Sequence, residues 1–143
     1  MKKWVCLSFC VLATLSFLMV IAGTANQAAA EKLEGAALEE HLISRSPWAG
    51  DWYTLGRTMN SGRVTYVFER IDGKLSAKIT EGTGGAERAL GPVWGLSVVK
   101  DTIHLASSAG TSHEFKLNEK GELAGKGTTR EGLSTNTLLK PSK

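Results

Sequence analysis

The residues best suited to chemistry in this chain are its three histidines, His41, His104 and His113. They are too few and too scattered to indicate a metal site, since ligands on one element recur at short, fixed spacings. Glu39-Glu40-His41 lacks the second histidine of a zinc-binding helix motif. The segment 132–136, Gly-Leu-Ser-Thr-Asn, lacks the second glycine of a serine-hydrolase elbow, and no phosphate-binding loop occurs. We therefore expect no enzymatic centre, no metal and no cofactor.

A second set of residues suits a pocket that binds without reacting, because it combines aromatic, hydroxyl and small side chains. His113 is its central member, and the alternative for His113 is a half-buried histidine satisfied by a hydroxyl or a backbone carbonyl. Arg70 either stacks over a tryptophan at a barrel rim or attracts an anionic ligand. The hypothetical ligand-binding residues are Tyr66, Arg70, Trp94, Ser107, His113, Phe115, Gly125 and Thr135.

From residue 47 onward, apolar and polar residues alternate with a period of two, which is typical of β-strands. These strands must position the side chains named above. Turn residues interrupt the alternation every 8–12 residues or so, which is the spacing of an all-β sandwich or barrel. Asp72-Gly73 is a strong hairpin signal. Because an open sheet leaves two exposed edges, the pattern predicts an eight-stranded antiparallel up-and-down barrel. The expected strands are 50–55, 63–71, 74–80, 93–99, 102–107, 112–118, 122–128 and 133–140.

The same alternation predicts which side chains face the barrel interior. That face is apolar but carries several hydroxyls, one tyrosine and one histidine, and such an interior is either filled or holds one small ligand. Gly125 and Gly127 remove two side chains from one wall. We expect a cavity near His113 and Gly125, open at one end, unless Trp94 and Tyr66 swing across and fill it. Trp52 and Trp94 are otherwise interpreted as core residues.

A short helix is predicted over residues 31–46, with Leu33, Ala37, Leu38 and Leu42 on one side. It ends at Ser46-Pro47 because a residue before proline is pushed out of the helical region. We expect this helix to brace one end of the barrel. The chain is then organised as an N-terminal segment over 1–30, the short helix over 31–46 and the β-barrel domain over 47–143.

Residues 1–30 have the form of a secretory signal peptide. Lys2 and Lys3 precede an apolar run over 4–21, and Ala28-x-Ala30 suits signal peptidase. We expect cleavage after Ala30, a periplasmic or secreted location and no stable membrane span afterwards; the alternative is an inner-membrane anchor through residues 4–21.

Removal of the signal changes the composition of the chain. Both cysteines lie within it, so the mature chain has no disulfide. Lys2 and Lys3 are removed with it and no acidic residue is, so the mature chain would contain 15 lysines and arginines and 14 acidic residues. With no basic run, nucleic acid is not an expected partner.

Trp48-x-Gly50-x-Trp52 resembles the opening of calycin barrels, a group that includes lipocalins and avidins. The order of later motifs, Asp72-Gly73-Lys74-Leu75, Asp101-Thr102-Ile103 and 121–125, is similar to that of compact lipocalin-like barrels of secreted bacterial proteins, sometimes appended to serine hydrolases. The resemblance implies the barrel fold, with Gly50 close to the barrel floor and Trp52 filling the closed end. The polar residues that avidins use against biotin have no counterpart here.

Three classes of function follow from this reading. The first is an exported, non-enzymatic module that holds a small, mostly apolar ligand in its barrel. The second is a structural or protein-interaction barrel with a filled core and an unidentified protein partner. The third is a small-barrel enzyme of unknown reaction.

Overall fold

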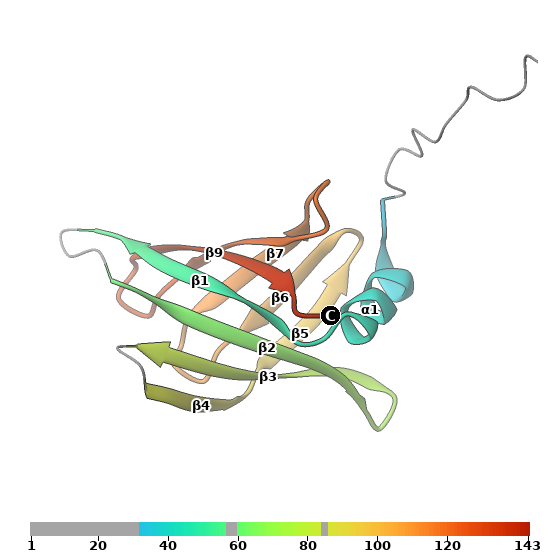
Figure 1. The fold of residues 1–143 in the computed structure, drawn as a ribbon, viewed down its shortest axis with the longest axis horizontal. Helices are drawn as coiled ribbons and strands as arrows, with labels where there is room; N and C mark the ends of the chain where they lie inside the picture. The colour runs from blue at the N-terminus through green and yellow to red at the C-terminus, as the bar shows by residue number, and fades with distance from the viewer. Residues whose placement is uncertain (1–31, 57–59, 84–85) are drawn as a thin grey trace, which may run out of the picture. The chain divides into compact units, whose positions relative to one another are not determined.

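The computed structural model describes residues 32–56, 60–83 and 86–143, so the predicted signal peptide lies outside the described residues. The predicted fold class is confirmed: antiparallel strands form a nearly closed barrel, preceded by one short helix (Figure 1). No helix within these ranges is long and apolar enough to cross a bilayer. The elements are α1 (Gly35–Ser44), β1 (Trp48–Leu55), β2 (Ser61–Ile71), β3 (Lys74–Thr83), β4 (Ala86–Pro92), β5 (Trp94–Val99), β6 (Thr102–Ala106), β7 (Ser112–Leu117), β8 (Leu123–Thr128) and β9 (Ser134–Pro141).

The barrel closes where the first strand meets the last. The sheet runs in the order β4-β3-β2-β1-β9-β8-β7-β6-β5. Strands adjacent in sequence therefore pair, except β4 and β5, and β1 also pairs with β9. The β1–β9 ladder extends from Trp48 opposite Pro141 to Leu55 opposite Ser134. The remaining seam lies between β4 and β5, where the Val93 amide donates a 3.0 Å hydrogen bond to the Ala77 carbonyl of β3.

The described residues contain nine strands rather than the predicted eight. The additional strand, β4, falls in a segment whose glycines and proline hide its extended character. It pairs with β3 through a register shift between Ile79 and Thr80, and Gly91 lies at that shift with a φ of 84°. A bulge of this kind bends a strand. The chain over β4 and β5 therefore pairs first with β3 and then with β6, which brings the two edges of the sheet together.

The inner face matches the predicted alternation. Buried apolar side chains come from every other position of the strands, and the positions between them face outward and are mostly polar, with exceptions such as Val67 and Leu138. The buried apolar side chains of the strands are Trp48, Val64, Tyr66, Phe68, Ala77, Ile79, Ile103, Leu105, Phe115, Leu123 and Leu139. Burial of these side chains is the main favourable contribution to the stability of the barrel.

Helix α1 closes one end of the barrel, and it is shorter than the predicted 31–46. Leu38 and Leu42 are fully buried, whereas Ala37, which was expected beside them, is exposed. The fully buried Trp48 donates its indole N–H to the Leu42 carbonyl at 2.9 Å. Trp48, rather than the predicted Trp52, therefore fills the closed end together with the helix.

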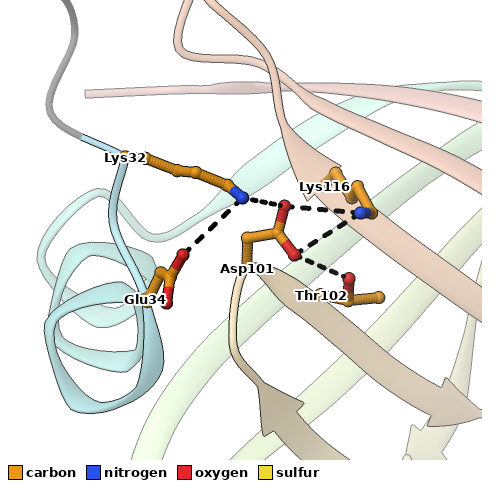
Figure 2. A network of polar contacts seen from close by, with 5 residues as sticks. All are labelled: Lys32, Glu34, Asp101, Thr102 and Lys116. Atoms are coloured by element: carbon orange, nitrogen blue, oxygen red, sulfur yellow. Dashed lines mark hydrogen bonds and ion pairs between the residues drawn. The ribbon is translucent and has the colours of Figure 1, made fainter.

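The helix begins late because the preceding residues reach toward the β5–β6 turn. The Gly35 amide donates to the Lys100 carbonyl at 2.9 Å. Figure 2 shows Asp101 between two lysines: Lys32 Nζ lies 3.0 Å and Lys116 Nζ 3.3 Å from its Oδ2 atom. The hydrogen bond from Lys32 is the largest cause that lowers the pKa of Asp101 to about 2, with Lys116 and Thr102 acting in the same direction. These contacts connect the residues before α1 to the β5–β6 turn and to β7 of the barrel.

We expect Trp48→Ala to lower the free energy of unfolding by about 3–5 kcal/mol, because truncating a core aromatic side chain leaves a cavity. Trp94→Ala is the matched control. Since Trp94 is 67% exposed, its loss should change stability by no more than about 0.5 kcal/mol. Urea denaturation of the two variants checks this. If both variants lose a similar amount of free energy of unfolding, packing at the end of the barrel that α1 closes does not depend on Trp48 in particular.

Asp101 gives the stability a defined dependence on pH. Because its folded pKa lies below its ordinary value of 3.8, the stabilisation is complete above about pH 5 and is lost as the pH falls toward about 2. Asp101→Asn should remove this component, so that between pH 5 and pH 2 the variant loses less stability than the wild type. Denaturation midpoints across this range test it, and parallel curves would contradict the assignment.

Candidate functional site

A cavity of about 230 Å³ lies inside the barrel, at the end away from α1. Its walls come from β1, β2, β3, β4, β7 and β9 and from the turns that follow β6 and β8. Trp52, Val64, Tyr66 and Ile79 supply aromatic and aliphatic surface. Thr54, Ser107, Thr111, His113, Thr135 and Thr137 supply polar surface. The cavity is thus apolar on one side and rich in hydroxyls on the other.

Strand register explains why the polar groups meet. His113 of β7 pairs with Gly127 of β8, which pairs with Thr135 of β9, which pairs with Thr54 of β1. These residues form one row across four strands, and inward-facing side chains of a row are neighbours. A Cβ atom on Gly127 would lie 2.6 Å from Thr135 Oγ1 and 2.7 Å from His113 Nδ1. Glycine at this position therefore lets both side chains converge on one point.

Four polar atoms around the cavity are buried without a hydrogen-bond partner among the described residues: Trp52 Nε1, His113 Nδ1, Thr135 Oγ1 and Thr137 Oγ1. Thr135 and Thr137 are each only 4% exposed. A buried polar group that makes no hydrogen bond costs about 1–3 kcal/mol. All four side chains line the same cavity, so the unpartnered polar atoms are gathered at one end of the barrel.

His113 is neutral at physiological pH, because burial lowers its pKa to about 4. A neutral imidazole has one donor and one acceptor nitrogen. Its ring stacks on Phe115 with the centroids 5.6 Å apart, which fixes its orientation. His113 can therefore offer a hydrogen bond to an uncharged partner without adding a positive charge to the interior.

The space beside Gly125, where the cavity was also expected, is filled. Phe115 is fully buried and pairs with Gly125, and a Cβ atom there would overlap the phenyl ring. Phe115 also makes an edge contact with Tyr66, with ring centroids 5.5 Å apart. Phe115 and Gly125 thus form solid core one row closer to α1, and the cavity lies on the other side of that row.

The structure brings four of the eight hypothetical ligand-binding residues together on the cavity: Tyr66, Ser107, His113 and Thr135. Arg70 lies at the opposite end, where its guanidinium pairs with Glu39 of α1 at 3.3 Å from Oε2, and not with any tryptophan of the described residues. The interpretation of Trp94 as a core residue is wrong. It pairs with Ala106 on the outer face, because the register shift that follows it in β5 turns its side chain outward.

Most of the lining residues were not among the eight predicted, and Thr137, Trp52 and Glu81 are the absent ones that bear most on binding. Thr137 and Trp52 lie on the predicted inner face, so alternation could have identified both. Glu81 could have been found in the same way, since it continues the series of Leu75, Ala77 and Ile79. It was missed because the predicted strand ended at residue 80.

A shallow groove of about 730 Å³ crosses the outer face between the exposed Trp94 and Leu55. It holds the one close pair of a histidine and a carboxylate found among the described residues, with His104 Nδ1 3.4 Å from Glu114 Oε1. The Glu114 side chain is 69% exposed and that of His104 is 39% exposed, so the pair lies at the surface beside water. No group of three or more potential metal ligands clusters within the described ranges.

Comparison of the chain with protein-family models, with curated proteins and with solved structures found no match. The geometry of the cavity is therefore the evidence on which a function can be proposed.

Gly125→Ala should destabilise the protein by about 1–3 kcal/mol, because an added methyl group overlaps the Phe115 ring and overpacks the core. Ala124→Val, at the neighbouring outward-facing position, serves as the control and should have little effect. Thermal and urea denaturation measure both. Wild-type stability of Gly125→Ala would mean that the cavity extends to this position.

Proposed function

We propose that this protein is an exported, non-enzymatic binding module that holds a small, mostly apolar ligand inside its barrel. The observation that carries the proposal is the convergence of four unpartnered buried polar atoms on one internal cavity. Native proteins satisfy most buried polar groups. A ligand with one or two hydrogen-bonding groups would satisfy these when it enters.

The size and lining of the cavity restrict the ligand. At about 230 Å³ the cavity is smaller than the roughly 300–1,000 Å³ typical of pockets for drug-sized molecules. A ligand of about one aromatic ring with a short substituent suits this space. Its apolar body would contact Trp52, Tyr66 and Ile79, and its polar group would face Thr135 and His113.

Export is part of the proposal and rests on the sequence of residues 1–30. The motif order that resembles lipocalin-like barrels of secreted bacterial proteins supports the same reading. N-terminal sequencing of the protein from its natural host should give a start between Asn26 and Glu31. A mature protein that retains residues 1–20 would favour the membrane anchor.

A protein-interaction barrel is the second candidate, and the exposed groove between Trp94 and Leu55 is the observation that favours it. Native mass spectrometry of the protein from its natural host separates the two candidates. A co-purifying small molecule supports the binding module, whereas a co-purifying protein supports the interaction barrel.

Thr135→Val and Thr137→Val test the internal site, because valine keeps the shape of threonine and removes the hydroxyl. We expect the free energy of unfolding to stay constant or rise by about 1 kcal/mol, since an unpaired buried hydroxyl is lost. Affinity for the neutral phenol 4-(2-hydroxyethyl)phenol should fall about tenfold, the equivalent of one hydrogen bond. Urea denaturation and calorimetric titration measure the two effects.

Thr128→Val is the matched control for these variants, because Thr128 lies exposed on the outer face of β8. It should change neither stability nor affinity. If Thr135→Val and Thr137→Val are destabilised and the wild type takes up no phenol, the hydroxyls serve the fold and the proposal fails.

A further inference from the structure

The charges around the cavity restrict its ligand further. Every charged side chain on the described lining is acidic: Glu81 at the end of β3 and Glu131 in the β8–β9 turn. No lysine or arginine of the described residues lines it. Among the described residues, the basic side chain that pairs with Glu81 is Arg88, whose Nη2 atom lies 3.9 Å from Glu81 Oε2. Because the Arg88 side chain is 75% exposed and the separation is long, this pair compensates little of the charge of Glu81.

The negative charge of Glu81 acts on the interior. The Glu81 side chain is only 25% exposed, and inward alternation places it beside Tyr66 and Ile79 in the cavity wall. Burial is the main cause that raises the pKa of Tyr66, and the charge of Glu81 raises it further. The carboxylate is therefore close enough to oppose a second negative charge within the cavity.

The described walls of the cavity are unfavourable for a carboxylate ligand. Beside Trp52 and Thr137 its charge would be buried without a basic partner among the described residues, and nearer the mouth it would be repelled by Glu81. An ammonium group meets the opposite situation. It can pair with Glu81 and lie against the electron-rich faces of Tyr66 and Trp52.

We infer that the ligand is a small organic amine, protonated at neutral pH, whose ammonium group lies toward Glu81 and whose uncharged body carries a hydrogen-bonding group toward Thr135 and His113. This inference rests on the proposed function and specifies the chemical class that the same cavity takes. Unpartnered hydroxyls on two buried threonines mark the uncharged end. Glu81 and Glu131 mark the charged end.

Three probes that differ in one terminal group test the inference: tyramine, 4-(2-hydroxyethyl)phenol and 4-hydroxyphenylacetate. All carry the same phenol, and their side chains end in a cation, a neutral hydroxyl and an anion. Titration of the mature protein should give the tightest binding for tyramine, about tenfold tighter than the neutral phenol. 4-Hydroxyphenylacetate should bind most weakly. The Trp52 indole N–H resonance, followed by NMR, should shift in each titration that shows binding.

Glu81→Gln should remove the preference for tyramine and leave affinity for the neutral phenol unchanged. Glu131→Gln, in an exposed turn, provides a second test that does not disturb a strand, and it should weaken tyramine alone. Glu114→Gln on the outer face is the control and should change none of the affinities. Melting temperatures verify that each variant is folded.

The outcomes distinguish this inference from the proposed function. If the neutral phenol binds but tyramine binds no better, or the acid binds best, the amine assignment is overturned and the binding module stands. If none of the three probes binds, both are overturned. A tyramine preference that survives Glu81→Gln and Glu131→Gln also overturns the assignment.

Discussion

Pairing of β1 with β9 is the contact on which the rest of the structure depends. It joins the two halves of the described sheet, β1–β4 and β5–β9, and leaves the seam between β4 and β5, which the bent chain over those strands spans. Closure also divides every strand into residues that face water and residues that face one enclosed volume. Gly50 allows this contact to be close, because a Cβ atom there would overlap the Leu138 carbonyl oxygen. The inner face must then be filled by side chains or left for a ligand.

One end of the barrel is filled by side chains, and the other end contains the cavity. Toward α1 the interior is dry and filled: Trp48 donates its N–H to the helix, and Phe115 covers Gly125. Toward the other end, threonines and His113 replace the large aliphatic side chains, and their polar atoms have no partners among the described residues. A filled half supplies stability to a barrel whose described residues include no cysteine, and it permits the other half to keep polar atoms unpaired at a cost. One end of the barrel thus acts as a rigid scaffold, and the unpaired polar side chains are gathered at the other end.

Strand alternation predicted most of the inner face, because a side-chain period of two leaves no freedom once a strand is closed into a barrel. It placed Tyr66, His113 and Thr135 correctly on the inner face and the helix at one end. It could not predict the bulge at Gly91 that creates β4, or the register shift that turns Trp94 outward, since both depend on pairing between strands. It also could not predict that Arg70 would pair with Glu39 of the helix. Contacts between elements decide these positions, and one strand's pattern contains no information about them.

The glycines of β8 show why an internal cavity is hard to predict from sequence. Gly125 and Gly127 both face inward on β8, and sequence alone suggested that both leave empty space. Their cross-strand neighbours differ: Phe115 reaches over Gly125 and fills the gap, whereas His113 and Thr135 flank Gly127 and present polar atoms. A missing side chain therefore creates a site only where its neighbours are too short or too polar to cover it. In this barrel that condition holds one row away from Phe115, where an imidazole nitrogen and a threonine hydroxyl meet.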